Sequence, residues 1–243
     1  MKKYLFIFVT SFIFSQGVGL NLSLIGHLPQ EEFKTAGVTT GFGIDFNAMY
    51  YVVNELAFGL NLGGSVYDIS KRPIPLNYYT DLITITEETS NNIGYGHLFM
   101  KVVPFQTRVK PYFEGLIGLK NLNTKTKVYS QDCNDDPDTD HDECEIAKST
   151  NASDNAFSYG YGAGFEIQLI DFNSSDAGYS DIEDGKLSFL FSFRYLYGNE
   201  ARYLKKGSIE YTDPEDGPVS TTFNWSQSRT DLIQLNFGLQ MTF

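Results

Sequence analysis

Apolar and polar residues alternate along most of the chain, and the last segment shows this pattern most clearly. From Ile233 to Phe243 every second residue is apolar, and the residues between them are polar or glycine. A period of two places all the apolar side chains on one face of a β-strand. A run this long exceeds the usual globular strand of about 5–6 residues. It matches the roughly 9–11 residues that a tilted transmembrane strand needs.

Seven further segments repeat the alternation, although one of them is less regular. One face of each segment carries Phe, Tyr, Leu and Ile, and the other carries Gly, Ser and Asn, which suit the crowded lumen of a narrow barrel. The sequence therefore predicts an all-β fold, an eight-stranded antiparallel up-and-down transmembrane β-barrel. A secreted β-sandwich would also alternate, but it would not usually expose Phe and Leu on nearly every strand. The seven segments are 18–24, 41–50, 56–63, 94–103 (the less regular one), 111–122, 158–169 and 187–197.

The predicted connections alternate in length, as expected for short turns on one side of a membrane and long loops on the other. Short turns are predicted near 53–55 and 104–110, and a longer one at 170–186 does not fit the rule. The four long connections are predicted to be extracellular. Apolar and aromatic residues in two of them either form a partner surface or extend the barrel strands above the membrane, and we favour extension. The long connections are 27–36, 68–93, 129–156 and 198–229.

The N-terminus has the features of a secretory signal peptide. Lys2 and Lys3 precede an apolar run from Tyr4 to Phe14, and Ser15 supplies a small residue before the predicted cut. The run is too short for a transmembrane helix, which needs about 20 apolar residues. A membrane anchor is the alternative. We predict a signal peptide over 1–15 and a single barrel domain over 16–243.

The charge balance excludes one class of partner. The chain has 18 Lys and Arg against 30 Asp and Glu, a net charge of −12. Nucleic-acid binding needs a basic surface, so no nucleic acid is expected as a partner. A mean hydropathy of −0.23 is compatible with a barrel, whose strands are apolar only at alternate positions.

The C-terminal residues resemble a known targeting sequence. Asn236, Gly238, Met241 and Phe243 occupy the polar, glycine, apolar and aromatic positions of the terminal β-signal of outer-membrane proteins. The whole mature chain is similar in pattern to the small OmpA/OmpX-like "outer membrane protein beta-barrel" family of the type common in Bacteroidetes. The resemblance implies a bacterial outer-membrane location. It also implies contact with the barrel-assembly machinery during biogenesis and with outer-membrane lipid afterwards.

Charged residues on the polar faces predict a network inside the lumen. Charges enclosed in a narrow barrel must pair, since a desolvated lone charge costs several kcal/mol. Three acids and three bases therefore predict a closed network that plugs the barrel, with a proton or ion path as the alternative. These residues are Asp45, Lys101, Glu114, Lys120, Glu166 and Arg194.

The segment around the two cysteines is the most unusual part of the sequence. Cys133 and Cys144 are predicted to form a disulfide in an oxidising compartment. Four alternating carboxylates lie between them and resemble the first half of an EF-hand-like Ca²⁺ loop. His141 and Ala147 stand where that loop has its glycine and its bidentate Glu, so a solvated acidic loop is the alternative. The candidate Ca²⁺ ligands are Asp136, Asp138, Asp140 and Asp142.

No spacing of residues identifies a catalytic site. Small barrel enzymes use His and Ser near the outer rim, where His27 is expected at the end of the first strand, but no triad identifies itself. The chain is therefore not expected to be an enzyme. The expected role is a structural or binding component, a subunit or surface scaffold in an outer-membrane complex with protein partners. The alternatives are a conduit for small solutes or hydrophobic ligands and, third, a lipid-modifying enzyme.

Overall fold

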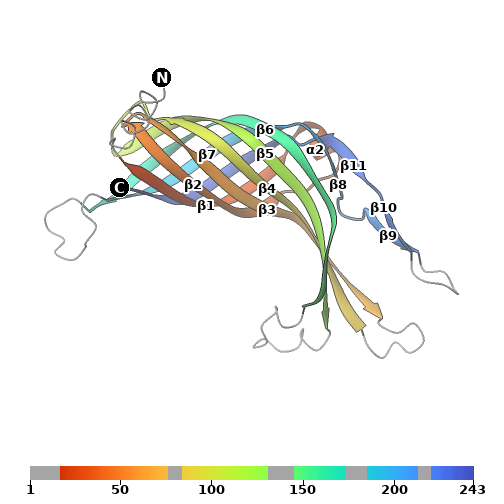
Figure 1. Cartoon of the computed structure of the whole chain (residues 1–243). Helices are drawn as coiled ribbons and strands as arrows, with labels where there is room; N and C mark the ends of the chain where they lie inside the picture. Colours follow the sequence, from red (N-terminus) through yellow and green to blue (C-terminus); the bar gives the residue numbers. More distant parts are fainter. Residues whose placement is uncertain (1–16, 76–83, 131–144, 173–184, 213–219) are drawn as a thin grey trace, which may run out of the picture.

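The computed structural model describes residues 17–75, 84–130, 145–172, 185–212 and 220–243 (Figure 1). The predicted signal peptide 1–15 lies outside the described residues. So do Cys133, Cys144 and the four candidate Ca²⁺ ligands between them. Most of the longer 170–186 connection also lies outside them, with β6 ending before it and β7 beginning after it.

Eight strands form a closed antiparallel barrel, so the predicted fold class is confirmed. Around the barrel the order is β1-β12-β7-β6-β5-β4-β3-β2, and each strand pairs with its neighbour along the chain except where β1 closes on β12. All eight segments that the alternation predicted lie in these strands. The bounds are β1 (Val18–Pro29), β2 (Gly41–Val53), β3 (Leu56–Pro75), β4 (Thr84–Val102), β5 (Val109–Ser130), β6 (Glu145–Asp171), β7 (Lys186–Gly198) and β12 (Leu232–Thr242).

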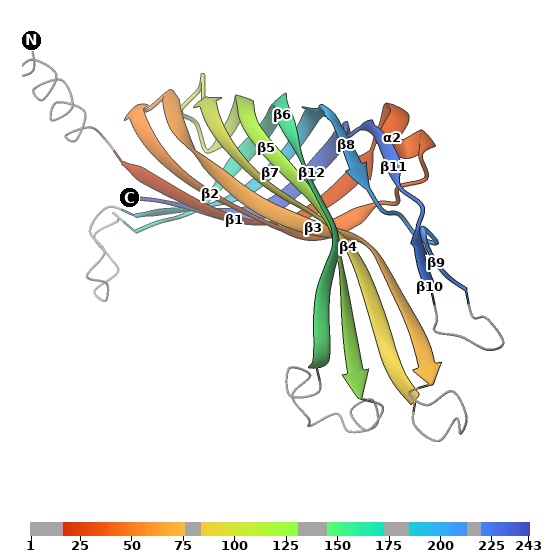
Figure 2. The ribbon, with the colours of Figure 1, turned by 45° about the vertical axis from the view of Figure 1, so that its right-hand side comes forward.

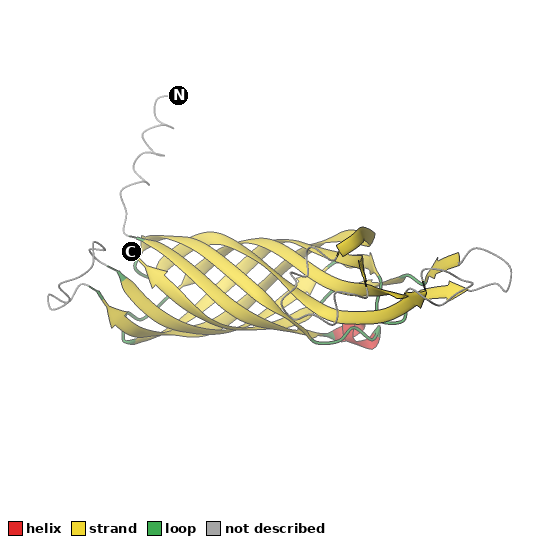
Figure 3. Cartoon of the chain, turned by 90° about the horizontal axis from the view of Figure 1, so that it is seen from below, coloured by secondary structure: helices red, strands yellow, loops and turns green. Residues whose placement is uncertain are grey.

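The barrel is apolar outside and polar inside, the reverse of a water-soluble domain. Leu24 and Phe42 on the outer surface are 68% and 72% exposed, whereas Asn61 and Gln234 inside are fully buried. Outward-facing Phe, Leu, Ile and Tyr recur on all eight strands and form an apolar belt around the barrel. Figure 3 shows the strands that make up this wall. Such a belt is the lipid-facing surface of a transmembrane barrel. In the described part of the chain, no helix has the length and apolar character needed to cross a bilayer.

The two ends of the barrel differ. One end, which we call the turn end, carries the short connections between β2 and β3 and between β4 and β5, and β12 finishes there (Figure 1). The other, the cap end, carries the short helix α2 (Glu31–Thr35) and two small hairpins. The hairpins pair β8 (Glu200–Tyr203) with β11 (Ser226–Arg229), and β9 (Ile209–Thr212) with β10 (Ser220–Phe223).

An apolar cluster seals the cap end. Phe33 of α2 is completely buried, and its ring packs edge-on against Tyr203 at 5.1 Å and Tyr67 at 6.4 Å. The Tyr67 hydroxyl donates to the Leu204 carbonyl at 3.0 Å, which ties β3 to the chain beyond β8. The cap therefore has its own small core above the polar lumen.

Four strands continue well beyond the barrel as a separate sheet, which we call the extension (Figure 2). It comprises residues 67–75 of β3, 84–92 of β4, 123–130 of β5 and 145–155 of β6. The predicted loop boundaries 68–93 and 129–156 were therefore wrong, because all of their described residues, 68–75, 84–93, 129–130 and 145–156, are strand. Both faces of the extension carry polar residues, so hydrophobic periodicity gave no signal for it.

The other two long connections also contain more structure than predicted. β1 continues to Pro29 inside the predicted loop 27–36, and α2 occupies most of the remainder. The connection 198–229 contains four short strands in two hairpins. The favoured expectation that strands continue beyond the barrel is correct for residues 68–75 and 84–93, whereas 76–83 lie outside the described residues.

Candidate functional site: a filled lumen and an external sheet

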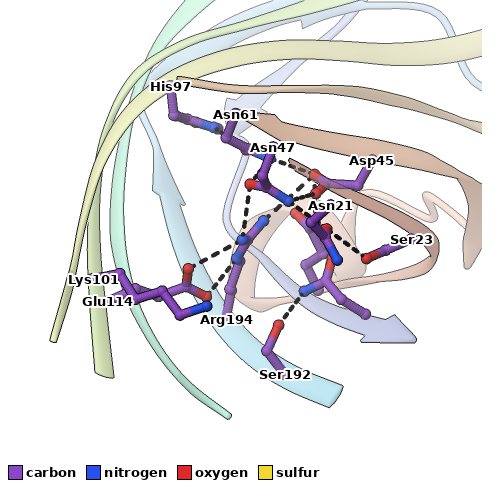
Figure 4. Close-up of polar contacts among 12 residues, drawn as sticks. Asn21, Ser23, Asp45, Asn47, Asn61, His97, Lys101, Glu114, Ser192 and Arg194 are labelled. Carbon is purple, nitrogen blue, oxygen red and sulfur yellow. Dashed lines mark hydrogen bonds and ion pairs between the residues drawn. The ribbon is translucent and has the colours of Figure 1, made fainter. Parts of the chain in front are cut away.

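Arg194 of β7 is at the centre of the lumen and is 3% exposed (Figure 4). Its guanidinium forms a two-point bond with Glu114 of β5, Nε to Oε1 at 2.7 Å and Nη2 to Oε2 at 3.1 Å. Nη1 also lies 3.4 Å from Asp45 Oδ2 on the opposite wall. A planar fork that binds two carboxylates suits Arg rather than Lys. The three predicted charges thus join three strands across the barrel.

Asp45 is held by neutral groups as well as by Arg194. Its Oδ1 accepts from Asn47 Nδ2 at 2.6 Å. Its Oδ2 accepts from Asn61 Nδ2 and from the Tyr95 hydroxyl, each at 2.6 Å, and from Gln234 Nε2 at 3.3 Å. Sequence reasoning did not select these four donors, although each occupies an inward position of its strand. A buried carboxylate with this many donors is fully solvated by the protein.

Lys101 and Glu166 form a second charge cluster nearer the turn end. Lys101 Nζ of β4 is in direct contact with Glu166 Oε1 of β6, and both side chains are almost completely buried. The ammonium also donates to Gln240 Oε1 at 3.1 Å and lies 4.1 Å above the Tyr112 ring. The pair thus gains a neutral acceptor and a cation–π contact.

Lys120 does not join the closed network of three acids and three bases that the sequence predicted. It is buried just beneath the cap, and its Nζ donates to the carbonyl oxygens of Thr230 at 2.9 Å and Leu196 at 3.2 Å. No carboxylate of the described residues forms an ion pair with it. Lys120 therefore links β5 to the top of β7 and to Thr230, two residues before β12. Among the described residues, the predicted lumen charges thus form two clusters and one separate cation.

The two histidines of the described chain are buried, and the expectation that His27 lies at the rim was wrong. His27 is 1% exposed, with Nδ1 2.6 Å from Ser65 Oγ and Nε2 3.2 Å from Gln234 Oε1. His97 has Nε2 3.0 Å from Ser158 Oγ and Nδ1 3.3 Å from Asn61 Oδ1. His27 points inward because it shares the parity of Asn21 and Ser23 along β1. Both His–Ser pairs lie inside the packed lumen, where a lipid substrate has no access.

The residues of the predicted assembly signal have structural partners in the finished barrel. Asn236 faces inward and donates to Ser192 Oγ at 2.8 Å. A Cβ on Gly238 would lie 2.4 Å from the Leu22 carbonyl oxygen, so the close β1–β12 contact requires glycine there. Met241 pairs with Leu20 across the same seam, and the Phe243 amide donates to the Val18 carbonyl at 2.9 Å. These residues close the barrel, and their role in assembly remains a prediction.

The extension is held by ladders of polar pairs. On one face Asn91 Nδ2 donates to Asp68 Oδ2 at 3.2 Å, and Thr124 Oγ1 donates to Asn91 Oδ1 at 2.6 Å. Near its tip Lys127 Nζ lies 2.6 Å from Glu145 Oε2, and this contact holds the pKa of the Glu145 carboxyl below its usual value. Apart from Tyr67, which belongs to the cap core, the described side chains of the extension form no apolar core.

The described residues give no second candidate metal site. Within the described ranges, no group of three or more His, Cys, Asp or Glu side chains is placed to hold a metal ion. The predicted Ca²⁺ ligands and the predicted disulfide fall outside those ranges and stay predictions.

Comparison with known proteins finds weak likenesses to solved structures. No protein family and no curated protein matches the sequence. Neisserial surface protein A matches at 12% identity, 93% coverage of this chain, 94% of that chain and a TM-score of 0.34. Ail, the attachment invasion locus protein of Yersinia pestis, matches at 12% identity, 94% and 100% coverage and a TM-score of 0.39. The N-terminal β-barrel domain of Pseudomonas aeruginosa OprF matches at 11% identity, 94% and 100% coverage and a TM-score of 0.32.

The chain is an eight-stranded up-and-down β-barrel of the transmembrane kind, as its own strand order and apolar belt establish. At these identities and TM-scores the likenesses support no conclusion about this chain, so its function must be argued from its own residues.

Proposed function

We propose that this protein is exported by its 1–15 segment, is inserted in the bacterial outer membrane, and acts there as a structural or binding component that presents the extension outside the membrane. The turn end then faces the periplasm, and the cap and the extension face the cell exterior. Short turns inside and long structured segments outside are the usual asymmetry of such barrels.

The observation that carries this proposal is the contrast between a filled lumen and an elaborate external sheet. Arg194, Glu114 and Asp45 bridge the lumen at mid-height, and the cap closes the outer end above them. Side chains packed in this way argue against a conduit for solutes. What the chain offers to a partner is therefore its outer surface.

The two edges of the extension differ in a way that favours one of them for pairing. The β3 edge contains Pro73 and Pro75, which lack a backbone N–H and weaken an edge as a pairing template. The β6 edge contains no proline between 145 and 157, and β7 pairs with β6 only from Ser158 onward. An extended segment of a protein partner could add to this edge through main-chain hydrogen bonds.

Site-specific photo-crosslinking on intact cells tests the proposal. A photoreactive residue at Ser149, exposed on the β6 edge, is compared with one at Gln227, which is exposed on β11 in the cap. We expect an adduct of discrete mass at Ser149, with none or much less at Gln227. Equal labelling at both positions, or none at Ser149, contradicts a partner on this edge.

Conductance provides an independent check on the lumen. We expect the purified barrel in planar bilayers to show no stable open state. A reproducible single-channel conductance would favour the conduit instead.

A further inference from the structure

The turn end of the barrel holds a pocket of about 740 Å³ that the proposed scaffold role does not use. Its volume is within the roughly 300–1,000 Å³ of typical small-molecule sites. Tyr51 and Glu166 line its inner part, where Gln240 donates to the Tyr51 hydroxyl at 3.1 Å and Lys101 engages Glu166. The charge cluster described above therefore forms the inner wall of this pocket.

Three cations line the same pocket: Arg108, Lys110 and Lys186. Lys110 shares the inward parity of Tyr112 and Glu114 on β5. Lys186 shares that of Ser188 and Ser192 on β7. Both side chains therefore point into the mouth of the barrel rather than toward lipid.

The acids beside these cations are too few to balance all three of them. Glu166 is already engaged by Lys101, whereas Asp171 lies opposite Lys186 in the β6–β7 register and also accepts a hydrogen bond from Gln168 at 3.0 Å. Asp171 can balance one cation, so the pocket keeps an excess of positive charge. Within the described residues, no ion pair or side-chain hydrogen bond is formed by Arg108, Lys110 or Lys186. A concave site with an excess of cationic side chains concentrates anions, and carboxylate or phosphate groups are the natural partners of Arg and Lys.

We propose that this pocket binds a small water-soluble anion with two or more carboxylate or phosphate groups, which enters from the turn end. This proposal rests on the proposed function only for the compartment from which the ligand comes, because the proposed orientation of the barrel places the turn end in the periplasm. The cations face the lumen axis, so the ligand comes from water and not from a lipid headgroup.

Calorimetric titration of the purified, folded barrel with citrate and with pyrophosphate tests the proposal. Saturable binding that weakens with added salt is expected for at least one probe. The triple variant Arg108→Gln/Lys110→Gln/Lys186→Gln should bind at least about tenfold more weakly, since one lost charged hydrogen bond corresponds to roughly that factor. The control Lys34→Gln/Lys71→Gln/Lys148→Gln removes the same charge from α2 and the extension and should leave binding unchanged.

Three results would overturn the proposal: no binding of either probe, equal weakening by the control, or loss of citrate binding in nanodiscs of phosphatidylglycerol but not phosphatidylcholine. The last would assign the site to a lipid headgroup. Circular dichroism confirms that each variant is folded before titration. A negative result here leaves the crosslinking test on the β6 edge unaffected, so the two proposals fail separately.

Discussion

The central ion pair of the lumen makes a quantitative prediction about barrel stability. Replacing Arg194 with Met removes both short bonds to Glu114, at 2.7 and 3.1 Å, and the longer contact with Asp45 at 3.4 Å. Asp45 keeps four neutral donors, whereas Glu114 loses both of its Arg194 bonds while still buried. The cost of Arg194→Met is therefore mainly the cost of an uncompensated Glu114 carboxylate.

The magnitude follows from that assignment. Hydrogen bonds to charged groups contribute about 1.5–3 kcal/mol each, and removing one member of a buried pair costs about 3–5 kcal/mol. We expect Arg194→Met to lower the free energy of unfolding by about 3–5 kcal/mol. Glu114→Gln should cost about 1–3 kcal/mol, because the amide oxygen still accepts from Arg194 and Asp45 still balances the guanidinium. The double variant should be more stable than Arg194→Met alone, because it leaves no unpaired carboxylate at residue 114.

Urea unfolding of the refolded barrel in detergent measures these differences. Far-UV circular dichroism follows the barrel, and the single tryptophan, Trp225, reports on the cap separately. Lys34→Met, a change at an exposed residue of α2, is the control and should be within about 0.5 kcal/mol of the parent protein. The reasoning fails if Arg194→Met costs less than about 1 kcal/mol, or if the double variant shows the sum of the two single effects.

Two further predictions concern the wall and the cap. Gly118→Ala should destabilise the barrel by about 1–3 kcal/mol in the same urea assay, because the added Cβ would lie 2.0 Å from the Gly96 carbonyl oxygen. Gly115→Ala on the same strand is the control and should be nearly neutral, because its Cβ would have no atom within 4 Å. Equal effects of the two variants would refute the close approach at Gly118. Phe33→Ala should remove about 3–5 kcal/mol of packing from the cap. The unfolding transition followed by Trp225 fluorescence should then shift to lower urea, while the transition followed by circular dichroism moves less. An equal shift in both signals would contradict a separate cap core.

The barrel could be predicted from the sequence because a lipid-facing strand must alternate apolar and polar residues, and this alternation is visible in a single sequence. Leu20, Leu22 and Leu24 had to face outward, and that fixed the inward parity of Asn21 and Ser23 on β1. The same parity placed Asp45, Glu114 and Arg194 in the lumen without knowledge of which strands faced each other. Periodicity is reliable here since each strand has one face in lipid and one in a packed interior.

The inward or outward position of a residue on its strand does not determine which side chains it contacts. Lys120, like the other predicted charges, points inward. Its height along β5 places it beneath the cap, where carbonyl oxygens rather than a carboxylate accept its hydrogen bonds. The rim position predicted for His27 was wrong because β1 continues to Pro29 and its inward positions are covered by the cap. Which side chains meet depends on the stagger between strands, and one strand's sequence does not contain that information.

The extension shows where the physical basis of the prediction ends. Both of its faces carry polar side chains, some of them buried, such as Asn91 and Thr124. Lys71, Glu88 and Lys127 therefore lie in paired strands without an alternation of apolar residues that would predict a strand. The belt, the lumen and the cap each have a burial requirement that accounts for their residues. The described residues of the extension beyond Tyr67 form no apolar core, yet its four strands stay paired over seven or eight register positions past the barrel. A sheet without a core of its own gains little stability from burial, so a binding surface is the role that best accounts for its presence, and its β6 edge is the part of the chain where a partner should first be sought.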